Sequence, residues 1–366
     1  MPAKKYPAQP DSVSIKEIAR RAGVSIGTVD RVVHNRGRVS KETDIKVRRI
    51  IEKTGYRPNI FASRLSRAKL FRFGVLMPYP DQDSGFWQLP LRGIERAANE
   101  LRSHRIEISH YFFDKYAPTP KAVHDLRRRL LNEKPDGLLV APVAPRWVNE
   151  SLSQLPENFP YVFFDTTLPD AAPVSTIIQD SFQSGVLAAK LSELLVGGSG
   201  EIVILQIAPS DFHLLERARG FRSYFQKHKT ITCLECVIDG SNIDDSLARH
   251  CQKMLKSHPG LKGVFVTNAA TFKAAEFLKR RSGTRSIHVI GYDLIPENMR
   301  YIKEGWIDFL INQRPETQAY TGIYTLYRRL VLDEEVKPCV MMPIDIITKE
   351  NLSYYENRNK SDEKNR

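Results

Sequence analysis

Short apolar runs alternate with longer amphipathic segments between residues 73 and 348, and no other feature restricts the possible folds so strongly. The apolar runs start at positions 73, 106, 137, 161, 201, 231, 263, 287, 309 and 344. Helix-like repeats of apolar residues occupy 89–103, 121–133, 181–196, 212–227, 243–258 and 270–281 between them. Such alternation predicts α/β architecture with parallel sheets and helices on both sheet faces.

The number of apolar runs predicts two lobes. About ten strands spread over nearly 280 residues suggest two sheets rather than one. Ligands of such sheets bind at the carboxyl ends of the strands, and with two lobes these ends converge on a cleft between them. We therefore expect functional side chains to follow the strands directly.

Positive charge is concentrated at the start of the chain. Residues 1–72 hold 18 Lys and Arg against 6 Asp and Glu, whereas the other 294 residues hold 37 and 36, and the net charge is +13. A small basic module in front of a neutral body predicts a polyanionic partner for that module. A solvated basic tail is the alternative, but the module is patterned rather than low in complexity.

Residues 14–55 carry start and stop signals for three short helices. Ser14 and Glu17 form a capping-box pattern, Gly23 permits a sharp turn, and Ser25 and Ser40 can cap the next two helices. The inward faces would be Ile15, Ile18, Ala19 and Ala22; Val29, Val32 and Val33; and Val47, Ile50, Ile51 and Thr54. This pattern describes a helix-turn-helix, although three-helix units also serve as protein–protein modules.

The second helix of a helix-turn-helix lies in the major groove of DNA. Its outward residues here would be Ser25, Ile26, Gly27, Thr28 and Arg31. Arg31 can bind guanine through two hydrogen bonds, Ile26 can contact a thymine methyl group, and the two hydroxyls can bind phosphate. Further basic residues are candidates for phosphate contacts: Arg20, Arg21, Arg36, Arg38, Lys41, Arg48 and Arg49.

The stretch IKEIARRAGVSIGTVDRVVHNRGRVSKETDIKVRRIIEKTGYRPNIFASRLS, residues 15–66, resembles the DNA-binding headpiece of the LacI/GalR family of bacterial regulators. The resemblance implies that Ile26, Gly27 and Arg31 lie against the bases, with readout mainly through Ile26 and Arg31. Asp30 stands where the family usually has Ser, so the operator sequence does not carry over. A carboxylate near phosphate is unfavourable unless a base such as Arg31 neutralises it.

Residues 59–70 follow as a linker. Pro58 disfavours helix at the residue before it, and a helix capped by Asn59 would be too short to be stable alone in water. The resemblance implies a hinge helix that orders on DNA and pairs with its dimer mate, with Ala62 small enough for close approach. It also implies that Leu65 wedges into the minor groove. Packing of Leu65 on the next domain is the alternative.

The rest of the chain, to about residue 350, resembles the periplasmic-binding-protein type I fold that the same family uses to bind effectors. The resemblance implies three crossings between the lobes. It places 71–170 and a helix at 315–333 in an N-lobe, and 171–312 and a strand at 343–348 in a C-lobe. The predicted domains are a flexible arm (1–12), an all-α headpiece (13–58), the hinge (59–70), the two-lobed body (71–350) and a flexible tail (351–366).

Several residues near predicted strand ends align with effector contacts of the family: Phe86, Trp87, Asp165, Arg217, Asn268, Asp293 and Gln313. An aromatic face can stack on a sugar ring, and arginine and carboxylates match neighbouring hydroxyl groups. Lobe packing is the alternative for the two aromatic residues, and a cap or turn is the alternative for the polar ones. Gln179 and Asp180 lie near a helix start, where a capping role is favoured for Asp180.

The remaining motifs predict no enzyme, metal site or cofactor. Cys233 and Cys236 form a C-x-x-C inside a predicted strand, where their side chains point to opposite faces, and the chain has only four cysteines. H-E-x-x-H, G-x-S-x-G and Walker A sequences are missing. The chain also lacks an apolar span and a secretory signal, so we expect a cytoplasmic protein.

These observations together predict a homodimeric transcription regulator of carbohydrate-metabolism genes that binds double-stranded operator DNA. A sugar or sugar derivative between the lobes would control it. We expect a repressor, although the same residues fit an activator. The alternatives are a sugar-binding protein of a transport system, whose body would look the same, and a sugar-acting enzyme with an appended DNA-binding module.

Overall fold

The computed structural model describes residues 15–33, 37, 39–54, 69–116, 119–207, 211–226, 230–238, 243–282 and 286–356 of the 366-residue chain. The chain divides into two compact units, Met1–Lys69 and Leu70–Arg366. We call them the headpiece and the body. Within the described residues, no helix is both long enough and apolar enough to cross a membrane.

The headpiece contains the three predicted helices, α1 (Ile15–Ala22), α2 (Ile26–Val33) and α3 (Lys41–Thr54). Gly23 adopts a left-handed conformation with φ of +68°, and the following N–H of Val24 donates to the carbonyl of Ala19 at 3.1 Å. The predicted inward residues Ile18, Ala19, Ala22, Val29, Val32 and Val47 form one buried core. The capping residue Ser14 and the stop residue Gly55 lie outside the described residues.

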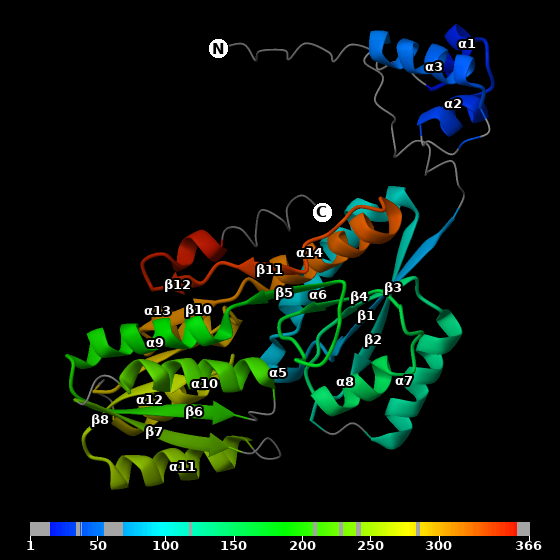
Figure 1. The fold of residues 1–366 in the computed structure, drawn as a ribbon. Helices are drawn as coiled ribbons and strands as arrows, with labels where there is room; N and C mark the ends of the chain where they lie inside the picture. Colours follow the sequence, from blue (N-terminus) through cyan, green and yellow to red (C-terminus); the bar gives the residue numbers. More distant parts are fainter. Residues whose placement is uncertain are drawn as a thin grey trace, which may run out of the picture. The chain divides into compact units, whose positions relative to one another are not determined.

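The N-lobe of the body is a parallel sheet with strand order β11-β5-β4-β3-β1-β2 (Figure 1). Its strands are β1 (Phe71–Pro78), β2 (Ile106–Phe113), β3 (Gly137–Val140), β4 (Tyr161–Phe164), β5 (Ser175–Gln179) and β11 (Cys339–Met342). One face is covered by α6 (Gln88–Leu101) and α14 (Pro315–Leu326), the other by α7 (Pro120–Glu133) and α8 (Pro145–Leu152). Short elements are α5 (Gln82–Gly85), a 3-10 turn (Arg102–His104) and a π-helical turn (Tyr327–Val331).

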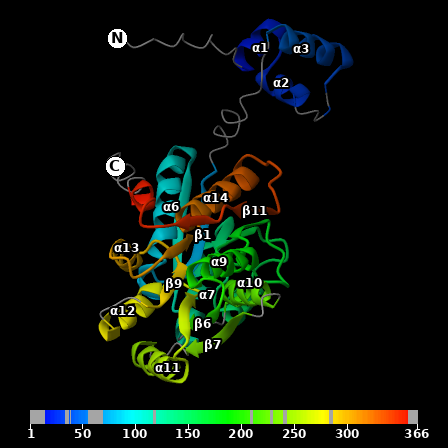
Figure 2. The ribbon, with the colours of Figure 1, turned by 90° about the vertical axis from the view of Figure 1, so that its left-hand side faces the viewer.

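The C-lobe repeats this plan with strand order β12-β10-β9-β8-β6-β7, in which only β12 runs antiparallel to its neighbour. Its strands are β6 (Gly200–Ile207), β7 (Ile231–Ile238), β8 (Leu261–Val266), β9 (His288–Tyr292), β10 (Phe309–Asn312) and β12 (Asp345–Ile347). Helices α9 (Ser181–Val196) and α10 (Phe212–Phe225) cover one face, and α11 (Ile243–Ser257), α12 (Thr271–Ser282) and α13 (Pro296–Lys303) the other (Figure 2).

Helices bury both faces of each sheet. Consecutive residues of a strand point to opposite faces, so both kinds of position are buried. In β6, Ile202 and Ile204 pack in the core beneath α9 and α10, whereas Val203 and Leu205 pack beneath α11 and α12. This arrangement explains why the sequence shows continuous apolar runs rather than alternation along each strand. It also confirms the expected architecture of parallel sheets between two layers of helices.

Two expectations about the body are wrong. The predicted C-lobe range 171–312 includes Ser175–Gln179, but these residues form β5 of the N-lobe sheet, between β4 and β11. The predicted flexible tail also begins too early, because 352–356 is helical and Leu352 is buried in the C-lobe core. The Glu356 carboxylate also pairs with the ammonium of Lys303 at the end of α13. Residues 357–366 lie outside the described residues.

The chain crosses between the lobes after β5, after β10 and after β11, as the three expected crossings require. The side chain of Gln179, at the end of β5, reaches the other two crossing segments. Its Nε2 group donates to the carbonyl of Asn312 at 3.2 Å and to the carbonyl of Pro343 at 2.9 Å. One amide group therefore ties all three crossings together.

Each lobe contains a pair of helices in very close contact, made possible by glycine. In the N-lobe, a Cβ atom on Gly93 of α6 would lie 2.0 Å from the carbonyl oxygen of Glu316 in α14. In the C-lobe, a Cβ on Gly220 of α10 would lie 2.0 Å from the carbonyl oxygen of Phe182, and one on Gly185 of α9 would lie 2.1 Å from that of Arg217. These contacts fix where α10 places its side chains.

We expect Gly220→Ala to lower the free energy of unfolding of the body by about 1–3 kcal/mol, because α9 and α10 must separate to admit the methyl group. Gly27→Ala is the matched control, since its added Cβ would meet its nearest atom, the Ser25 hydroxyl, at 3.7 Å. Thermal and denaturant unfolding of both variants measures the difference. A Gly220→Ala protein as stable as the wild type would contradict the close approach of the two helices.

Candidate nucleic-acid interface and interlobe site

The exposed face of α2 is the candidate nucleic-acid interface. The Ser25 hydroxyl caps α2 by accepting the N–H of Thr28 at 3.1 Å, and the two hydroxyls lie 2.9 Å apart. Ile26 is 45% exposed, and Gly27 and Arg31 are exposed beside it. An exposed apolar group next to an arginine suits base edges in a groove better than it suits water.

Some of the predicted phosphate contacts have carboxylate partners inside the headpiece. Arg20 and Arg21 both donate to Glu17, at 2.7–2.8 Å, and these hydrogen bonds lower the pKa of Glu17 to about 2. Arg48 donates to Asp44 at 2.8 Å and to the carbonyl of Val32 at 3.2 Å, which joins α3 to α2. These arginines therefore stabilise the headpiece and are partly neutralised.

Arg31, Lys41 and Arg49 are exposed and stay the better candidates for direct DNA contacts. Arg36 and Arg38, and the hinge residues Ala62 and Leu65, lie outside the described residues, so their predicted roles stay predictions.

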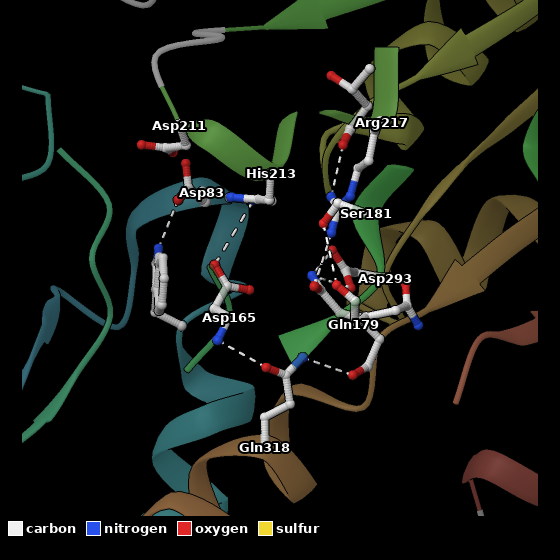
Figure 3. Close-up of polar contacts among 12 residues, drawn as sticks. Asp83, Asp165, Gln179, Ser181, Asp211, His213, Arg217, Asp293 and Gln318 are labelled. Atoms are coloured by element: carbon white, nitrogen blue, oxygen red, sulfur yellow. Dashed lines mark hydrogen bonds and ion pairs between the residues drawn. The ribbon is translucent and has the colours of Figure 1, made fainter. Parts of the chain in front are cut away.

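A second group of polar side chains gathers at the carboxyl ends of the strands, where the two lobes face each other (Figure 3). We define this interlobe cluster as Asp83, Lys115, Asp165, Asp211, His213, Arg217, Asp293 and Gln313. Asp211, His213 and Arg217 lie at or near the start of α10, which follows β6. The other five residues of the cluster follow β1, β2, β4, β9 and β10. Polar side chains therefore follow the strands in both lobes, and their role in ligand binding stays a prediction.

Arg217 is the most enclosed cation of the cluster, with 1% of its surface exposed. Its Nη1 donates to the carbonyl of Thr267 at 2.8 Å and its Nη2 to Oε1 of Gln313 at 2.9 Å. The guanidinium lies over the ring of Tyr292, 3.8 Å from the ring centroid. The Gln313 amide in turn donates to both carboxylate oxygens of Asp293, at 3.1 and 3.2 Å. Arg217, Gln313 and Asp293 thus form one fixed unit.

Asp165 and Asp293 occupy corresponding positions in the two lobes. Each follows the fourth strand of its lobe, is buried, and has a left-handed backbone with φ of +69° or +70°. Aspartate tolerates this conformation better than most residues. Gln318 of α14 connects the two positions, since its Oε1 accepts the N–H of Asp165 at 2.8 Å and its Nε2 donates to the carbonyl of Gln313 at 2.9 Å (Figure 3).

Lys115 joins the two lobes through a buried ion-pair bridge. Its Nζ lies 3.0 Å from Asp83 of the N-lobe and 2.8 Å from Asp211 of the C-lobe, and 7% of the side chain is exposed. Burial alone would lower the pKa of Lys115, but the two carboxylates outweigh burial and raise this pKa well above its usual value. The Asp83 carboxylate also accepts hydrogen bonds from Trp87 Nε1 and the Tyr116 hydroxyl.

The start of α10 makes two further contacts with the N-lobe. The Asp211 carboxylate accepts the N–H of Ala144 at 3.2 Å, and His213 Nε2 lies 3.9 Å from Asp165. Burial, Arg217 and Lys115 all lower the pKa of His213 well below its usual value. His213 is therefore uncharged, and its approach to Asp165 is not an ion pair.

Burial also determines the charge of the two corresponding aspartates. Burial raises the pKa of Asp165 to about 7 and that of Asp293 to about 6, and the attraction of Arg217 offsets only part of this effect. Within the described residues, Asp165 Oδ1, Thr166 Oγ1, His213 Nδ1, Arg217 Nε and Thr267 Oγ1 are buried without a hydrogen-bond partner. Such atoms are unfavourable in a folded protein unless a ligand or water satisfies them.

The structure brings four of the predicted effector residues together, Asp165, Arg217, Asp293 and Gln313, all of them buried. Asn268 lies beside them but is used in a turn, since its side chain bonds the carbonyl of Ile207 and the N–H of Ala270. This matches the alternative considered for it.

Phe86 and Trp87 are buried in the N-lobe core, at 5% and 1% exposed, with Trp87 edge-on to Phe164. This favours lobe packing, the alternative considered for them. Asp180 caps α9 by accepting the N–H of Gln183 at 2.8 Å, as favoured.

Five polar residues at this site were not predicted from the sequence: Asp83, Lys115, Asp211, His213 and Gln318. Two signals could have found some of them. Lys115 lies two residues beyond the strand that ends at Phe113, which is the criterion used for the other candidates. His213 precedes Arg217 by four residues, so the two share one face of α10. The pairing of Lys115 with carboxylates from both lobes leaves no local sequence pattern.

Comparison with known proteins identifies two family models in this chain. The model of the lacI family of bacterial regulatory proteins matches residues 14–59, and the model of a periplasmic binding protein domain matches residues 73–334. The ribose operon repressor of Bacillus subtilis is 28% identical over 289 residues, which cover 78% of this chain and 82% of that protein.

Two further comparisons extend this result. The xylose/arabinose-binding protein XylF of Sulfolobus acidocaldarius is 23% identical over 237 residues, 60% of this chain and 58% of that protein. A solved structure assigned to a LacI transcriptional regulator from Bacteroides fragilis is 30% identical with a TM-score of 0.71, and the match covers 78% of this chain and all of that one. A repressor, a transcriptional regulator and a sugar-binding protein are thus all similar to this chain.

We expect Asp165→Asn to raise the free energy of unfolding by about 1–3 kcal/mol at pH 8. The pKa of Asp165 is about 7 in the folded protein against 3.8 for an ordinary aspartate, so the folded state binds the proton more tightly and loses stability as the pH rises between these values. Asparagine removes this loss and tolerates the left-handed backbone.

Unfolding measured from pH 4 to pH 8 tests this expectation, with Asp125→Asn on the exposed side of α7 as the charge-matched control. The gain should shrink steadily toward pH 4. A variant less stable than the wild type at pH 8 would show that Asp165 is well solvated or fully compensated.

Proposed function

Because the chain belongs to the lacI family of bacterial regulatory proteins, with a periplasmic-binding-protein domain behind its headpiece, we propose that it represses carbohydrate genes under the control of a small polyhydroxylated effector. One observation carries the proposal. The same chain holds an exposed, capped helix suited to base edges and a buried polar cluster that draws side chains from both lobes of the body. Neither feature alone would indicate a regulator.

The headpiece supplies the DNA-binding half of the proposal. Ser25 and Thr28 at the start of α2 can bind phosphate with help from the positive helix terminus, and Ile26 and Arg31 can read base edges. A single helix of this kind covers only a few base pairs, so paired half-sites need paired headpieces. We therefore propose a homodimer on a two-fold symmetric operator.

The interlobe cluster supplies the regulatory half. Arg217, Gln313 and Asp293 form a fixed unit of donors and acceptors in the C-lobe, and Asp165 faces it from the N-lobe. A ligand whose hydroxyls bind both groups favours one angle between the lobes. Because the N-lobe leads into residues 59–70, a change in this angle alters the free energy of the DNA-bound hinge. Effector binding and operator binding are thus coupled through one body with two states.

The alternative function, sugar binding for a transport system, accounts for the body but not for residues 14–59. XylF of Sulfolobus acidocaldarius is similar to 60% of this chain. The basic headpiece, with its match to lacI-type regulators, has no role in that alternative. The regulator is therefore the better explanation of the whole chain.

We expect Arg31→Ala to weaken binding to the preferred operator by about 1–3 kcal/mol and to relax the choice of base at one position. Arg49→Ala on α3 is the comparison variant. It should weaken binding to all duplexes about equally and reduce the salt dependence, because a phosphate contact carries no sequence information. Selection of duplexes from a random pool, followed by fluorescence anisotropy at several salt concentrations, measures both effects. Wild-type protein without preference for any symmetric duplex would refute the proposal.

We expect Arg217→Met to abolish the response to effector and to leave operator binding intact. Methionine keeps packing against Tyr292 but removes the donors to Thr267 and Gln313. Arg219→Met on the same helix is the matched control, since Arg219 is exposed and its contacts, the Glu216 carboxylate and the Phe182 ring, lie outside the interlobe cluster. Thermal shift with a panel of sugars, and operator binding with and without each hit, provide the measurement. A normal response in Arg217→Met would show that the effector binds elsewhere.

A further inference from the structure

Resting on the proposed function, we propose that the interlobe site takes a polyhydroxylated ligand without negative charge and rejects its phosphorylated or carboxylated derivatives. Asp83 and Asp211 impose this choice, because they neutralise the one lysine that could receive an anionic group. The family relationship does not decide this point. The charges and contacts of the cluster in this chain do.

Carboxylates outnumber cations in the cluster. Lys115 and Arg217 are its basic groups, and Asp83, Asp165, Asp211 and Asp293 are its acidic ones, while His213 is uncharged. All of these groups are buried or nearly so, where an uncompensated charge is expensive. An anionic ligand would add a further negative charge to a region that already has an excess of negative groups.

Lys115 cannot offset such a ligand. Its ammonium is shared by Asp83 at 3.0 Å and Asp211 at 2.8 Å, one from each lobe, and its side chain is almost fully buried. Binding a phosphate would require one of these carboxylates to release the ammonium and stay behind in the same buried region. The bridge therefore removes Lys115 from the set of groups that can contact an anion.

Arg217 is also occupied. Two of its nitrogens donate to Thr267 and Gln313, and within the described residues only Nε is buried without a partner. Its charge already acts on both Asp165 and Asp293. A guanidinium has five N–H groups, so Arg217 keeps donors for ligand hydroxyls, but the positive charge that an anion would need is already shared by two carboxylates.

The remaining unpartnered atoms suit hydroxyl groups. Asp165 Oδ1 and Gln179 Oε1 accept only, and the hydroxyls of Thr166 and Thr267 donate or accept. One sugar hydroxyl can donate to the Asp165 carboxylate, and the oxygen of another can accept from Arg217 Nε. An anionic oxygen has no proton to donate to Asp165 and would meet its carboxylate directly.

The burial of Asp165 agrees with this reading. Burial and the neighbouring carboxylates raise the pKa of Asp165 to about 7, even with Arg217 and Lys115 nearby. A ligand hydroxyl that donates to Asp165 stabilises the ionised carboxylate, whereas a ligand anion destabilises it further.

The test compares neutral sugars with their own anionic derivatives on the full-length protein. The probes are ribose and ribose 5-phosphate, fructose and fructose 6-phosphate, glucose with glucose 6-phosphate and glucuronate, and galactose with galacturonate. Thermal shift identifies the parent sugars that bind, and calorimetry gives their affinities. We expect each anionic derivative to bind at least about 100-fold more weakly than its parent, because it adds a buried charge without a partner.

Asp211→Asn tests the role assigned to the bridge. Asparagine keeps an oxygen that can accept the N–H of Ala144 but no longer neutralises Lys115. We expect this variant to reduce the difference in affinity between each parent sugar and its anionic derivative by at least about tenfold. Once residue 211 is uncharged, the Lys115 ammonium can attract an anionic group of the ligand. Asp83→Asn makes the same test from the other lobe if Asp211→Asn does not fold. Asp125→Asn changes the net charge by the same amount outside the cluster and should leave this difference in affinity unchanged.

Three results would overturn the proposal. The first is an anionic derivative that binds the wild type as tightly as its parent sugar. The others are an affinity difference that Asp211→Asn and Asp83→Asn both leave unchanged, and a set of probes of which none binds. Operator binding measured in parallel separates this failure from failure of the proposed function. A protein that binds a symmetric duplex and responds to a phosphorylated sugar would refute the charge selection alone. A protein that binds neutral sugars but no duplex would refute the regulatory function alone.

Discussion

The burial of Arg217 is the interaction that organises the interlobe cluster. Removing a guanidinium from water is costly, and the cost is met here by a backbone carbonyl, an amide side chain, an aromatic face and nearby carboxylates from both lobes. These partners sit on different strands and can meet only if both sheets and the crossings between them are in place. The close packing of α9 on α10 holds the helix that carries Arg217. Fold and site are therefore determined together.

The two lobes are versions of one design, and the site uses this symmetry. Each lobe has a left-handed aspartate after its fourth strand and a glutamine at or just after the end of its fifth, Asp165 with Gln179 and Asp293 with Gln313. The glutamines have diverged in role. Gln313 orients Arg217 and Asp293, whereas Gln179 binds the crossing segments. Repetition of the same local geometry explains why both lobes direct acidic groups at the space between them.

The sequence alone predicts most of the fold because buried parallel strands are continuously apolar and their helices are amphipathic. The sequence does not predict β5 and β11, which are both short strands. β5 begins with Ser and Thr and ends with Gln, so it lacks a continuous apolar run. Asp165, Asp293 and Gln313 could be placed at the carboxyl ends of strands because each directly follows one, and Arg217 is placed by the family resemblance. That they bind an effector stays a prediction. The Lys115 bridge could not be predicted, because its two carboxylate partners lie 32 and 96 positions away along the chain and in different lobes.

Gln179 has a mechanical consequence for the body. The described chain passes between the lobes at three places, and one amide group holds these places together. Rotation of one lobe against the other therefore turns about an axis that runs close to this side chain. A side chain near such an axis moves little, while the outer edge of a sheet travels along a wide arc. A small rotation at this point would thus become a much larger displacement at the far end of the N-lobe, as in a lever.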